Sequence, residues 1–157
     1  MNTQYAFFSS PVGFLKLEAD DTHLVSVQFV DEKGFVPPKT LVVSGILKQA
    51  VSELTEYFSG KRRHFTVAVK HTGTDFQLSV WHALATIPYG KTVPYQDVAI
   101  KVGNAKAVRA IGRTNGLNAI AIVVPCHRVI GKSGKMVGYA SGVWRKEWLL
   151  AHEQKYM

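Results

Sequence analysis

The sequence predicts an α+β protein in two parts, a small α/β unit followed by a mainly helical domain. Three short runs rich in Val, Leu, Phe and Tyr come first, and one helical pattern follows them. The second half instead carries three helical patterns separated by turn residues. With 157 residues, 46% of them hydrophobic, the chain suits one domain or two small ones and can bury a core.

The first part, residues 1–70, is predicted to form a supporting α/β domain. Its strands are expected at 4–9, 14–19 and 23–30, as an antiparallel meander with turn residues between them. Apolar residues then recur at helical spacing from Ile46 to Phe58, and Gly60 is expected to stop the helix. The run 65–69 alternates enough to predict one more strand. We identify no catalytic motif in this part.

The second part, residues 75–157, follows an expected linker at 71–74. An apolar helical stripe runs from Phe76 to Ile87 and ends before a proline. Two further short helices are predicted over 95–102 and 106–115, with a glycine-containing turn between them. Such a pair makes a helix-turn-helix. Taken alone the pattern is weak, because packed helix pairs that bind no DNA are common.

Positive charge is concentrated in this second part. The formal net charge is +8, and residues 1–74 carry eight Lys/Arg against seven Asp/Glu, whereas 75–157 carry eleven against four. From Lys91 to Lys135, eight basic residues are opposed only by Asp97. A one-sided basic half indicates a polyanionic partner such as nucleic acid. The alternative is a generally basic enzyme, and a membrane surface is disfavoured because no strongly amphipathic basic helix is evident.

Several classes of protein are excluded by composition. No apolar run approaches the length that spans a bilayer. The first residues do not have the basic and apolar regions of a signal peptide. The single cysteine excludes an intrachain disulfide and fits a reducing cytosol, and the six histidines show no metal-binding cluster. We therefore expect a cytoplasmic monomer without metal or cofactor.

The lone cysteine stands in the run Pro125-Cys126-His127-Arg128. The apolar run 119–124 predicts a strand that delivers the sulfur to a turn, and the proline suits the end of that strand. A proton acceptor and a fixed positive charge behind the cysteine favour the thiolate, which is the nucleophile. Neighbours on a strand or helix do not face each other, so the two side chains cooperate only across a bend or a water. The alternative is an inert buried cysteine beside a surface histidine.

The segment 125–129, PCHRV, resembles the active-site signature of the O6-alkylguanine-DNA alkyltransferases, also called methylated-DNA–protein-cysteine methyltransferases. The resemblance covers about residues 76–153, and its other segments keep the family's order and approximate spacing: 93–99, 107–112, Asn118, 138–139 and 146–153. It is only loose over the first seventy residues. The family implies a ribonuclease-H-like N-terminal unit without that enzyme's chemistry, and a winged-helix-like C-terminal domain.

The resemblance implies that Cys126 takes an alkyl group from O6 of guanine in DNA. His127 resembles the general base that acts through a bridging water, and Glu153 the carboxylate that orients the imidazole, as in a triad. By position alone Glu153 would be a solvated residue. Asn118 resembles the hydrogen-bonding side chain behind the active-site turn, and Tyr95 the phenol that donates to the guanine ring. Without the resemblance they would be a turn residue and a core aromatic.

The substrate pocket that the resemblance implies contains four residues: Tyr139, Ala140, Val129 and Met136. Ala140 departs from the serine that the family often has there. A backbone N–H can still donate to O6, but side-chain help from this position is missing. The sequence does not rank methyl against bulkier groups, or O6-alkylguanine against O4-alkylthymine.

The partner implied is double-stranded DNA, bound through its minor groove. Because the target atom is inaccessible in a duplex, the base must be flipped out, and Arg109 resembles the arginine that fills the vacated stack. Without the resemblance, Arg109 would be interpreted as a contact to a DNA phosphate. The small side chains of Ala107, Ala110 and Gly112 suit a helix in a narrow groove. The candidates for phosphate contacts are Lys101, Lys106, Arg113, Arg128, Lys132 and Lys135.

The product would be a stable thioether, and the sequence offers no second cysteine, metal or cofactor to reverse it, so one turnover per molecule is expected. Two other functions compete with this one. A cysteine hydrolase built on Cys126, His127 and Glu153 is disfavoured, because such enzymes usually place the base far away in sequence. A lesion-binding module without transfer activity is disfavoured by the presence of the cysteine.

Overall fold

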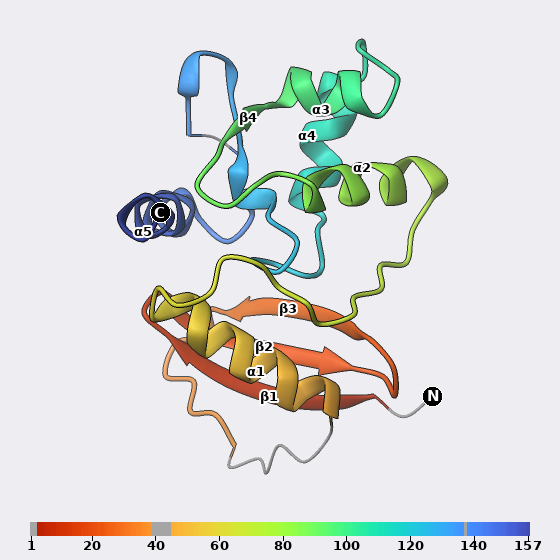
Figure 1. The fold of residues 1–157 in the computed structure, drawn as a ribbon. Coiled ribbons are helices and arrows are strands. Elements are labelled where there is room, and N and C mark those ends of the chain that lie inside the picture. Colours follow the sequence, from red (N-terminus) through yellow and green to blue (C-terminus); the bar gives the residue numbers. More distant parts are fainter. Residues whose placement is uncertain (1–2, 39–44, 137) are drawn as a thin grey trace. The chain divides into compact units, whose positions relative to one another are not determined.

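The computed structural model describes residues 3–38, 45–136 and 138–157. The first two residues, which entered the argument about a signal peptide, lie outside these ranges. The chain divides into two compact units, residues 1–70 and 71–157. The first is a small sheet with one helix and the second is mainly helical, which confirms the predicted α+β class (Figure 1).

The first unit is built on the predicted meander. The strands β1 (Gln4–Ser10), β2 (Gly13–Ala19) and β3 (Leu24–Val30) pair antiparallel in that order. Alternate residues of β2, such as Leu15 and Leu17, are fully buried, as the period of two in a strand requires. Helix α1 (Gly45–Phe58) covers one face of this sheet (Figure 1).

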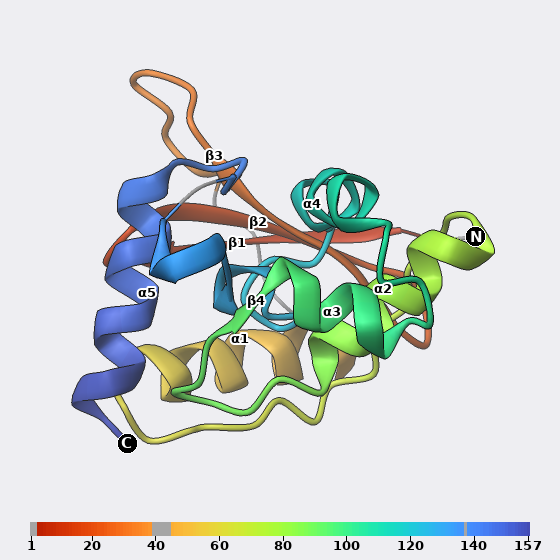
Figure 2. The same ribbon diagram turned by 90° about the horizontal axis from the view of Figure 1, so that it is seen from above.

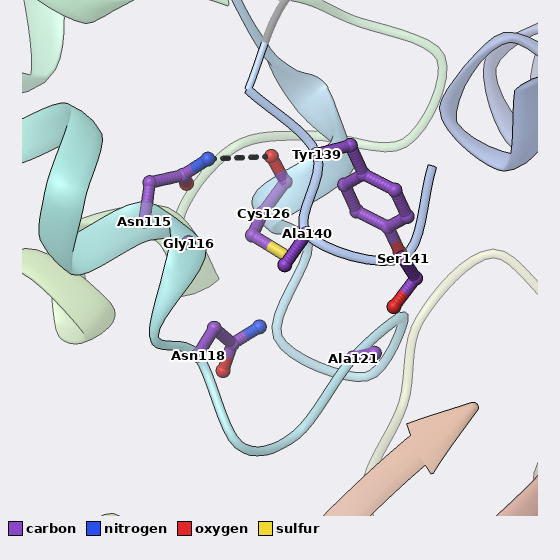
Figure 3. A pocket seen from close by; sticks show the side chains of 8 residues that line it. All are labelled: Asn115, Gly116, Asn118, Ala121, Cys126, Tyr139, Ala140 and Ser141. Carbon is purple, nitrogen blue, oxygen red and sulfur yellow. Dashed lines mark hydrogen bonds between the residues drawn. The ribbon is translucent and has the colours of Figure 1, made fainter. Parts of the chain in front are cut away.

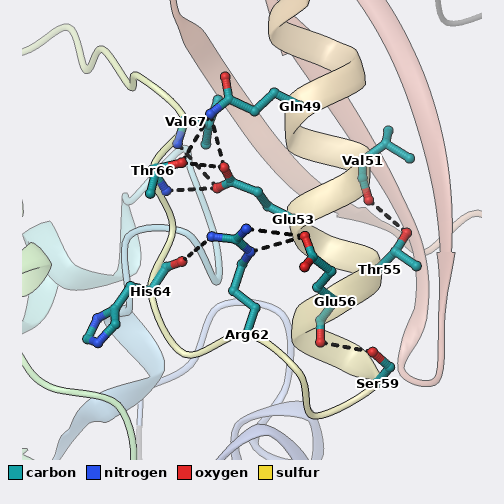
Figure 4. Close-up of polar contacts among 10 residues, drawn as sticks. All are labelled: Gln49, Val51, Glu53, Thr55, Glu56, Ser59, Arg62, His64, Thr66 and Val67. Carbon is teal, nitrogen blue, oxygen red and sulfur yellow. Dashed lines mark hydrogen bonds and ion pairs between the residues drawn. The ribbon is translucent and has the colours of Figure 1, made fainter.

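The run 65–69 does not form the predicted strand. Only Val69 bridges to β3, at Leu24. The backbone N–H groups of Thr66 and Val67 instead donate to the carboxylate of Glu53 on α1, at 2.8 and 3.2 Å (Figure 4). The prediction was wrong because a side chain, and not a neighbouring strand, binds these backbone groups.

The second unit contains the predicted helix-turn-helix. Helix α2 (Asp75–Ala85) begins with a capping box between Thr74 and Gln77 and ends before the proline. Helices α3 (Tyr95–Lys101) and α4 (Val108–Gly116) follow it, and they are joined by a turn in which Gly103 has a positive φ of 84°. The indole of Trp81 on α2 donates to the carbonyl of Thr114 at 3.0 Å, which anchors the end of α4.

The run 119–124 is a compact loop and not the predicted strand. Its backbone folds back on itself, with Val124 N donating to Ile120 O at 3.0 Å and Ile122 at a φ of 72°. The side chain of Asn118 accepts from Ile120 N and donates to Val124 O. The apolar composition therefore reflects the burial of this loop, which a polar side chain holds from within.

A short ladder joins two distant parts of this unit. Strand β4 (Val93–Pro94) pairs parallel with β5 (Val129–Ile130). The one-turn 3-10 helix η1 (Cys126–Arg128) directly precedes β5, a second one, η2 (Lys132–Gly134), follows it, and α5 (Val143–Lys155) closes the chain. Helix α5 lies on one side of β4, and α2, α3 and α4 lie on the other (Figure 1, Figure 2). None of the described helices is long and apolar enough to cross a membrane.

Candidate active site

Cys126 is the first residue of η1 and faces a small cavity. Its side chain is almost entirely buried, with 5% of the residue exposed. The cavity measures about 30 Å³ and is lined by eight residues (Figure 3): Asn115, Gly116, Asn118, Ala121, Cys126, Tyr139, Ala140 and Ser141. A cavity of this size can hold a water molecule or a methyl-sized group.

The 3-10 turn places His127 beside Glu153, on α5. The two wholly buried side chains are joined by a 2.7 Å contact between Nε2 and Oε2. Burial lowers the pKa of His127, although the hydrogen bond and charge of Glu153 counteract part of this shift. Since an ionised carboxylate only accepts, the neutral imidazole donates from Nε2. Its Nδ1 is then an acceptor, and it has no hydrogen-bond partner among the described residues.

Glu153 also receives the side chain of Arg128. The guanidinium donates from Nε to Oε1 at 2.9 Å and from Nη2 to Oε2 at 3.0 Å, and the backbone N–H of Gly90 donates to Oε1 at 3.1 Å. Burial alone would raise the pKa of Glu153, but the hydrogen bonds and charges of His127 and Arg128 hold it well below its usual range. The carboxylate therefore stays ionised in the interior.

Arg128 cannot serve as the predicted phosphate contact. It is buried, and its remaining Nη1 donates to the carbonyl of Ile87 at 2.7 Å. Its charge neutralises Glu153 inside the protein, so the prediction that placed it against DNA was wrong. The sequence showed the basic residue but not the carboxylate 25 residues further along the chain that binds it.

Lys146 is a site residue that the sequence reasoning missed. It is fully buried on α5, and its ammonium donates to the carbonyl of Val129 in β5. Burial lowers the pKa of Lys146, and the interaction with Cys126 partly offsets this. The available signal was its place two helical turns before Glu153, which puts both residues on one face of α5.

The thiol of Cys126 is protonated at rest. Burial raises its pKa, and the hydrogen bond with Asn118 and the charge of Lys146 only partly lower it. We expected His127 and Arg128 to favour the thiolate over the thiol, but burial of the sulfur acts in the opposite direction and is the largest effect. Burial dominates, and the charge of Arg128 is neutralised by Glu153. The sulfur therefore needs a proton acceptor before it can attack.

Asn118 connects the thiol to the backbone of the loop behind it. Its Nδ2 donates to the carbonyls of Val124 and Ile120, and its Oδ1 accepts from Ile120 N. His71, at the start of the second unit, also contacts Oδ1 through Nε2 at 2.8 Å and stacks on Trp81. The sequence reasoning did not single out His71. These contacts hold Asn118 in one orientation against the sulfur.

Two phenols lie close to Cys126. Tyr95 is held there because β4, which precedes it, pairs with β5. Burial and the interaction with Cys126 raise its pKa, and a hydrogen bond with Asn115 opposes the shift. Burial and Cys126 also raise the pKa of Tyr139, whose hydroxyl has no hydrogen-bond partner among the described residues. Gly138 has a φ of 73°, and a Cβ there would stand 2.9 Å from the Tyr95 hydroxyl, so a larger residue would clash.

The predicted pocket residues are only partly brought together. Tyr139 and Ala140 line the cavity, as expected. The wholly buried Val129 of β5 and the half-buried Met136 do not line it. Asn115, by contrast, was not predicted and lines the cavity directly.

The predicted DNA-contact residues other than Arg128 lie at the surface. The side chains of Lys101, Lys106, Arg109, Arg113, Lys132 and Lys135 are exposed. Ala107, at the start of α4, and Ala110 and Gly112, within it, are half-buried. Within the described ranges, no group of three or more His, Cys, Asp or Glu residues is placed to hold a metal ion.

Sequence profiles of known families match both units. Residues 75–155 match the DNA binding domain of 6-O-methylguanine DNA methyltransferase, and residues 3–71 match its ribonuclease-like domain. The chain belongs to this methyltransferase family. Among curated members, the methylated-DNA–protein-cysteine methyltransferase of Methanosarcina acetivorans is 46% identical, over 95% of this chain and 97% of its own.

Solved methyltransferase structures share the whole fold. The crystal structure of Mycobacterium tuberculosis O6-methylguanine methyltransferase is 40% identical, with a TM-score of 0.87 over 99% of this chain and 95% of its own. Mycobacterium tuberculosis OGT in complex with DNA is 42% identical, with a TM-score of 0.86 over 97% of this chain and 93% of its own.

Proposed function

We propose that this chain repairs DNA by transferring the alkyl group of O6-alkylguanine to Cys126. The observation that carries the proposal is the arrangement around the sulfur: a buried, protonated thiol next to a neutral imidazole whose other nitrogen is held by a buried carboxylate. This is the order of nucleophile, base and orienting group that activates a weak nucleophile. The named activity of the relatives supports the same reaction.

The reaction is a displacement at the alkyl carbon. His127 accepts the thiol proton at Nδ1 through a bridging water, and the negative charge of Glu153 stabilises the resulting imidazolium. The sulfur forms a bond to the carbon while the bond between that carbon and O6 breaks. Tyr95 gives its hydroxyl proton to the departing guanine, which therefore leaves without net charge. The proton held by His127 then returns through solvent to the Tyr95 oxygen, so both side chains end as they began.

The other residues around the sulfur position the reactants. Asn118 orients the thiol through its hydrogen bond, and Lys146 stabilises the developing thiolate with its buried charge. Tyr139 and Ala140 form the wall against which the alkyl group lies.

DNA is bound by the exposed face of α4. Arg109 fills the stack that the flipped base leaves, Ala107, Ala110 and Gly112 allow the helix into the minor groove, and the exposed lysines and Arg113 contact phosphates. The Mycobacterium tuberculosis relative solved with DNA supports this partner. Residues 75–157 thus carry binding and catalysis, residues 1–70 support them, and the protein acts as a monomer in the cytoplasm.

The proposal is tested by the mass of the intact protein after incubation with duplex DNA containing O6-methylguanine. We expect a gain of one methyl group that saturates at one per protein and is absent in Cys126→Ser. Transfer far beyond one methyl per protein, with unmodified Cys126, would establish a hydrolase. Tight binding without any mass gain would establish a lesion-binding module.

The DNA face is tested by salt dependence. Replacing Lys106 or Arg113 with alanine should weaken binding uniformly across sequences and reduce the slope of log affinity against log salt by about one each. Glu147→Gln, an exposed site on α5, serves as a control that also changes charge. An unchanged slope in both lysine and arginine variants would remove these residues from the interface.

A further inference from the structure

His71 is a half-buried titratable residue that the proposed transfer reaction does not use. It is the first residue of the second unit, and its imidazole stacks on the indole of Trp81, with ring centroids 4.4 Å apart and an angle of 21° between the planes. Its Nε2 lies 2.8 Å from Oδ1 of Asn118, 47 residues further along the chain. Asn118 lines the cavity beside Cys126, so His71 contacts a residue next to the reacting sulfur.

The loop around Asn118 fixes the direction of this contact. The backbone N–H of Ile120 donates to Oδ1 at 3.1 Å, and Nδ2 donates to the carbonyls of Val124 and Ile120 at 2.8 and 3.3 Å. Because an amide oxygen can only accept, the imidazole of His71 donates to it from Nε2. The neutral Nε2–H tautomer and the imidazolium can both do this, so the contact does not depend on the charge of His71.

The contact with His71 completes the acceptor capacity of the amide oxygen. A carbonyl oxygen has two lone pairs, and those of Oδ1 are taken by Ile120 N and His71 Nε2. The NH₂ group gives one hydrogen to Val124 O, and the other, whose contact with Ile120 O is longer, serves the hydrogen bond with the sulfur. Figure 3 shows the nitrogen of the Asn118 amide turned toward Cys126 and the oxygen turned away.

We propose that His71 is a positioning residue for the transfer reaction: by donating to Asn118 Oδ1, it leaves this amide able to face the Cys126 sulfur only as a donor. The inference rests on the proposed alkyl transfer. A donor binds the thiolate more strongly than the thiol, so it favours the form of the sulfur that attacks. Without His71, one lone pair of Oδ1 is left over, and the amide can turn toward the S–H group and stabilise the thiol.

The imidazole of His71 is itself held in place. Trp81, on which it stacks, donates its indole N–H to the carbonyl of Thr114 at 3.0 Å. Burial lowers the pKa of His71, the hydrogen bond with Asn118 opposes this shift, and the exposed His82 on α2 adds to it. At neutral pH the ring is therefore mostly uncharged. His71 thus acts on Asn118 as a hydrogen-bond donor and not as a charge.

Two substitutions separate the hydrogen bond of His71 from its stack on Trp81. His71→Phe keeps an aromatic ring on the indole but has no N–H to donate. His71→Gln loses the ring but carries an amide N–H at a position similar to Nε2. His82→Gln removes an exposed histidine of α2 and is the matched control. Methyl transfer from duplex O6-methylguanine to Cys126 is measured under single-turnover conditions over a range of DNA concentrations.

The maximal transfer rate is expected to follow the donor and not the ring. It should fall about 3- to 10-fold in His71→Phe, the effect of one neutral hydrogen bond, while the DNA concentration at half-maximal rate stays unchanged. His71→Gln and His82→Gln should both stay within about twofold of the native rate. A native rate in His71→Phe, or a rate in His71→Gln as low as in His71→Phe, would overturn the inference.

Two NMR measurements test the same contact without kinetics. The ring nitrogen shifts of His71 in the native protein should show the Nε2–H tautomer at neutral pH. An Nδ1–H tautomer would overturn the inference, because Nε2 could then not donate. Since Cys126 is the only cysteine, an isotope label at the cysteine Cβ gives a single signal. Its titration should show a higher thiol pKa in His71→Phe than in the native protein, and an equal pKa would show that His71 is only structural.

Failure of this inference is distinguishable from failure of the proposed function. If the native protein gains no methyl group from O6-methylguanine, the proposed function is wrong and the role of His71 falls with it. If native protein and His71→Phe gain one at equal rates, alkyl transfer stands and only the role of His71 falls. Thermal unfolding establishes that each variant is folded at the assay temperature. If His71→Phe does not fold, the tautomer in the native protein decides.

Discussion

Among the residues that the structure describes, each unit buries one carboxylate, and the two carboxylates are hydrogen-bonded in different ways. Glu53 on α1 is bound by neutral groups only: the backbone N–H groups of Thr66 and Val67, the Thr66 hydroxyl and the Gln49 amide (Figure 4). Glu153 on α5 is bound by a guanidinium, an imidazole and one backbone N–H. Burial would raise both pKa values, yet hydrogen bonds lower both below the ordinary value.

The difference shows what each carboxylate does. The donors around Glu53 have no proton that titrates near neutral pH, so this group ties a loop to a helix and nothing more. Around Glu153, one partner can change its charge, and the carboxylate stabilises the charged form of that partner. A buried carboxylate with neutral donors is a structural link, whereas one with a titratable partner can support a proton transfer.

The largest expected difference between Glu153 and Glu53 is in the rate of methyl transfer. Glu153→Gln keeps the shape and a hydrogen-bond acceptor for His127 but removes the charge that stabilises the imidazolium. We expect transfer to slow by about 10³- to 10⁴-fold, the loss seen when an orienting carboxylate is replaced by an amide. Single-turnover kinetics on O6-methylguanine duplexes measure it. A loss below tenfold would mean that His127 does not become charged in the reaction.

The next effect is on stability. Arg128→Met removes the buried cation and leaves Glu153 without its bidentate partner, so the free energy of unfolding should fall by about 3–5 kcal/mol. Arg62→Met is the matched control, since Arg62 pairs with the half-exposed Glu56 at 3.2 Å, and pairs of this kind contribute about 1 kcal/mol or less. Chemical denaturation gives both values. Equal losses would show that burial of the pair is unimportant.

A smaller effect is expected at the structural carboxylate. Glu53→Gln points an amide NH₂ at groups that donate, so the free energy of unfolding should fall by about 1–3 kcal/mol. The rate of transfer should stay within about twofold of the native rate. A variant that is stable but slow would contradict the distinction drawn between the two carboxylates.

The smallest effect concerns pH. Because burial lowers the pKa of His127 below its ordinary value of 6.5, more than half of the imidazole is in the neutral, basic form at pH 6.5. We expect the transfer rate to change little from pH 8 down to 6.5 and to fall only at lower pH. Stability depends on pH in the same direction. The unfolded chain, whose histidine has the ordinary pKa, binds a proton at this site more readily than the folded protein does. The free energy of unfolding therefore decreases as the pH falls below 6.5 and through the folded-state pKa of His127. A rate that already halves at 7 would contradict the lowered pKa.

Local periodicity was enough for most of the fold. The meander, α1, α2 and the helix-turn-helix lie within a few residues of their predicted bounds, because each repeats its apolar residues with its own period. The two runs predicted as strands and found as loops, 65–69 and 119–124, share one cause. In each, a polar side chain, Glu53 or Asn118, binds backbone groups that a strand would have paired.

The sequence by itself determined the nucleophile, its neighbouring base, the basic helix-turn-helix and, through the resemblance, the reaction. Only the tertiary structure decided where the charges act. It turned Arg128 inward to Glu153, brought Lys146 and Tyr95 to the sulfur, and left the thiol protonated. The physical reason is that a pKa depends on burial and on nearby partners, and those partners lie on α3 and α5, far from Cys126 along the chain.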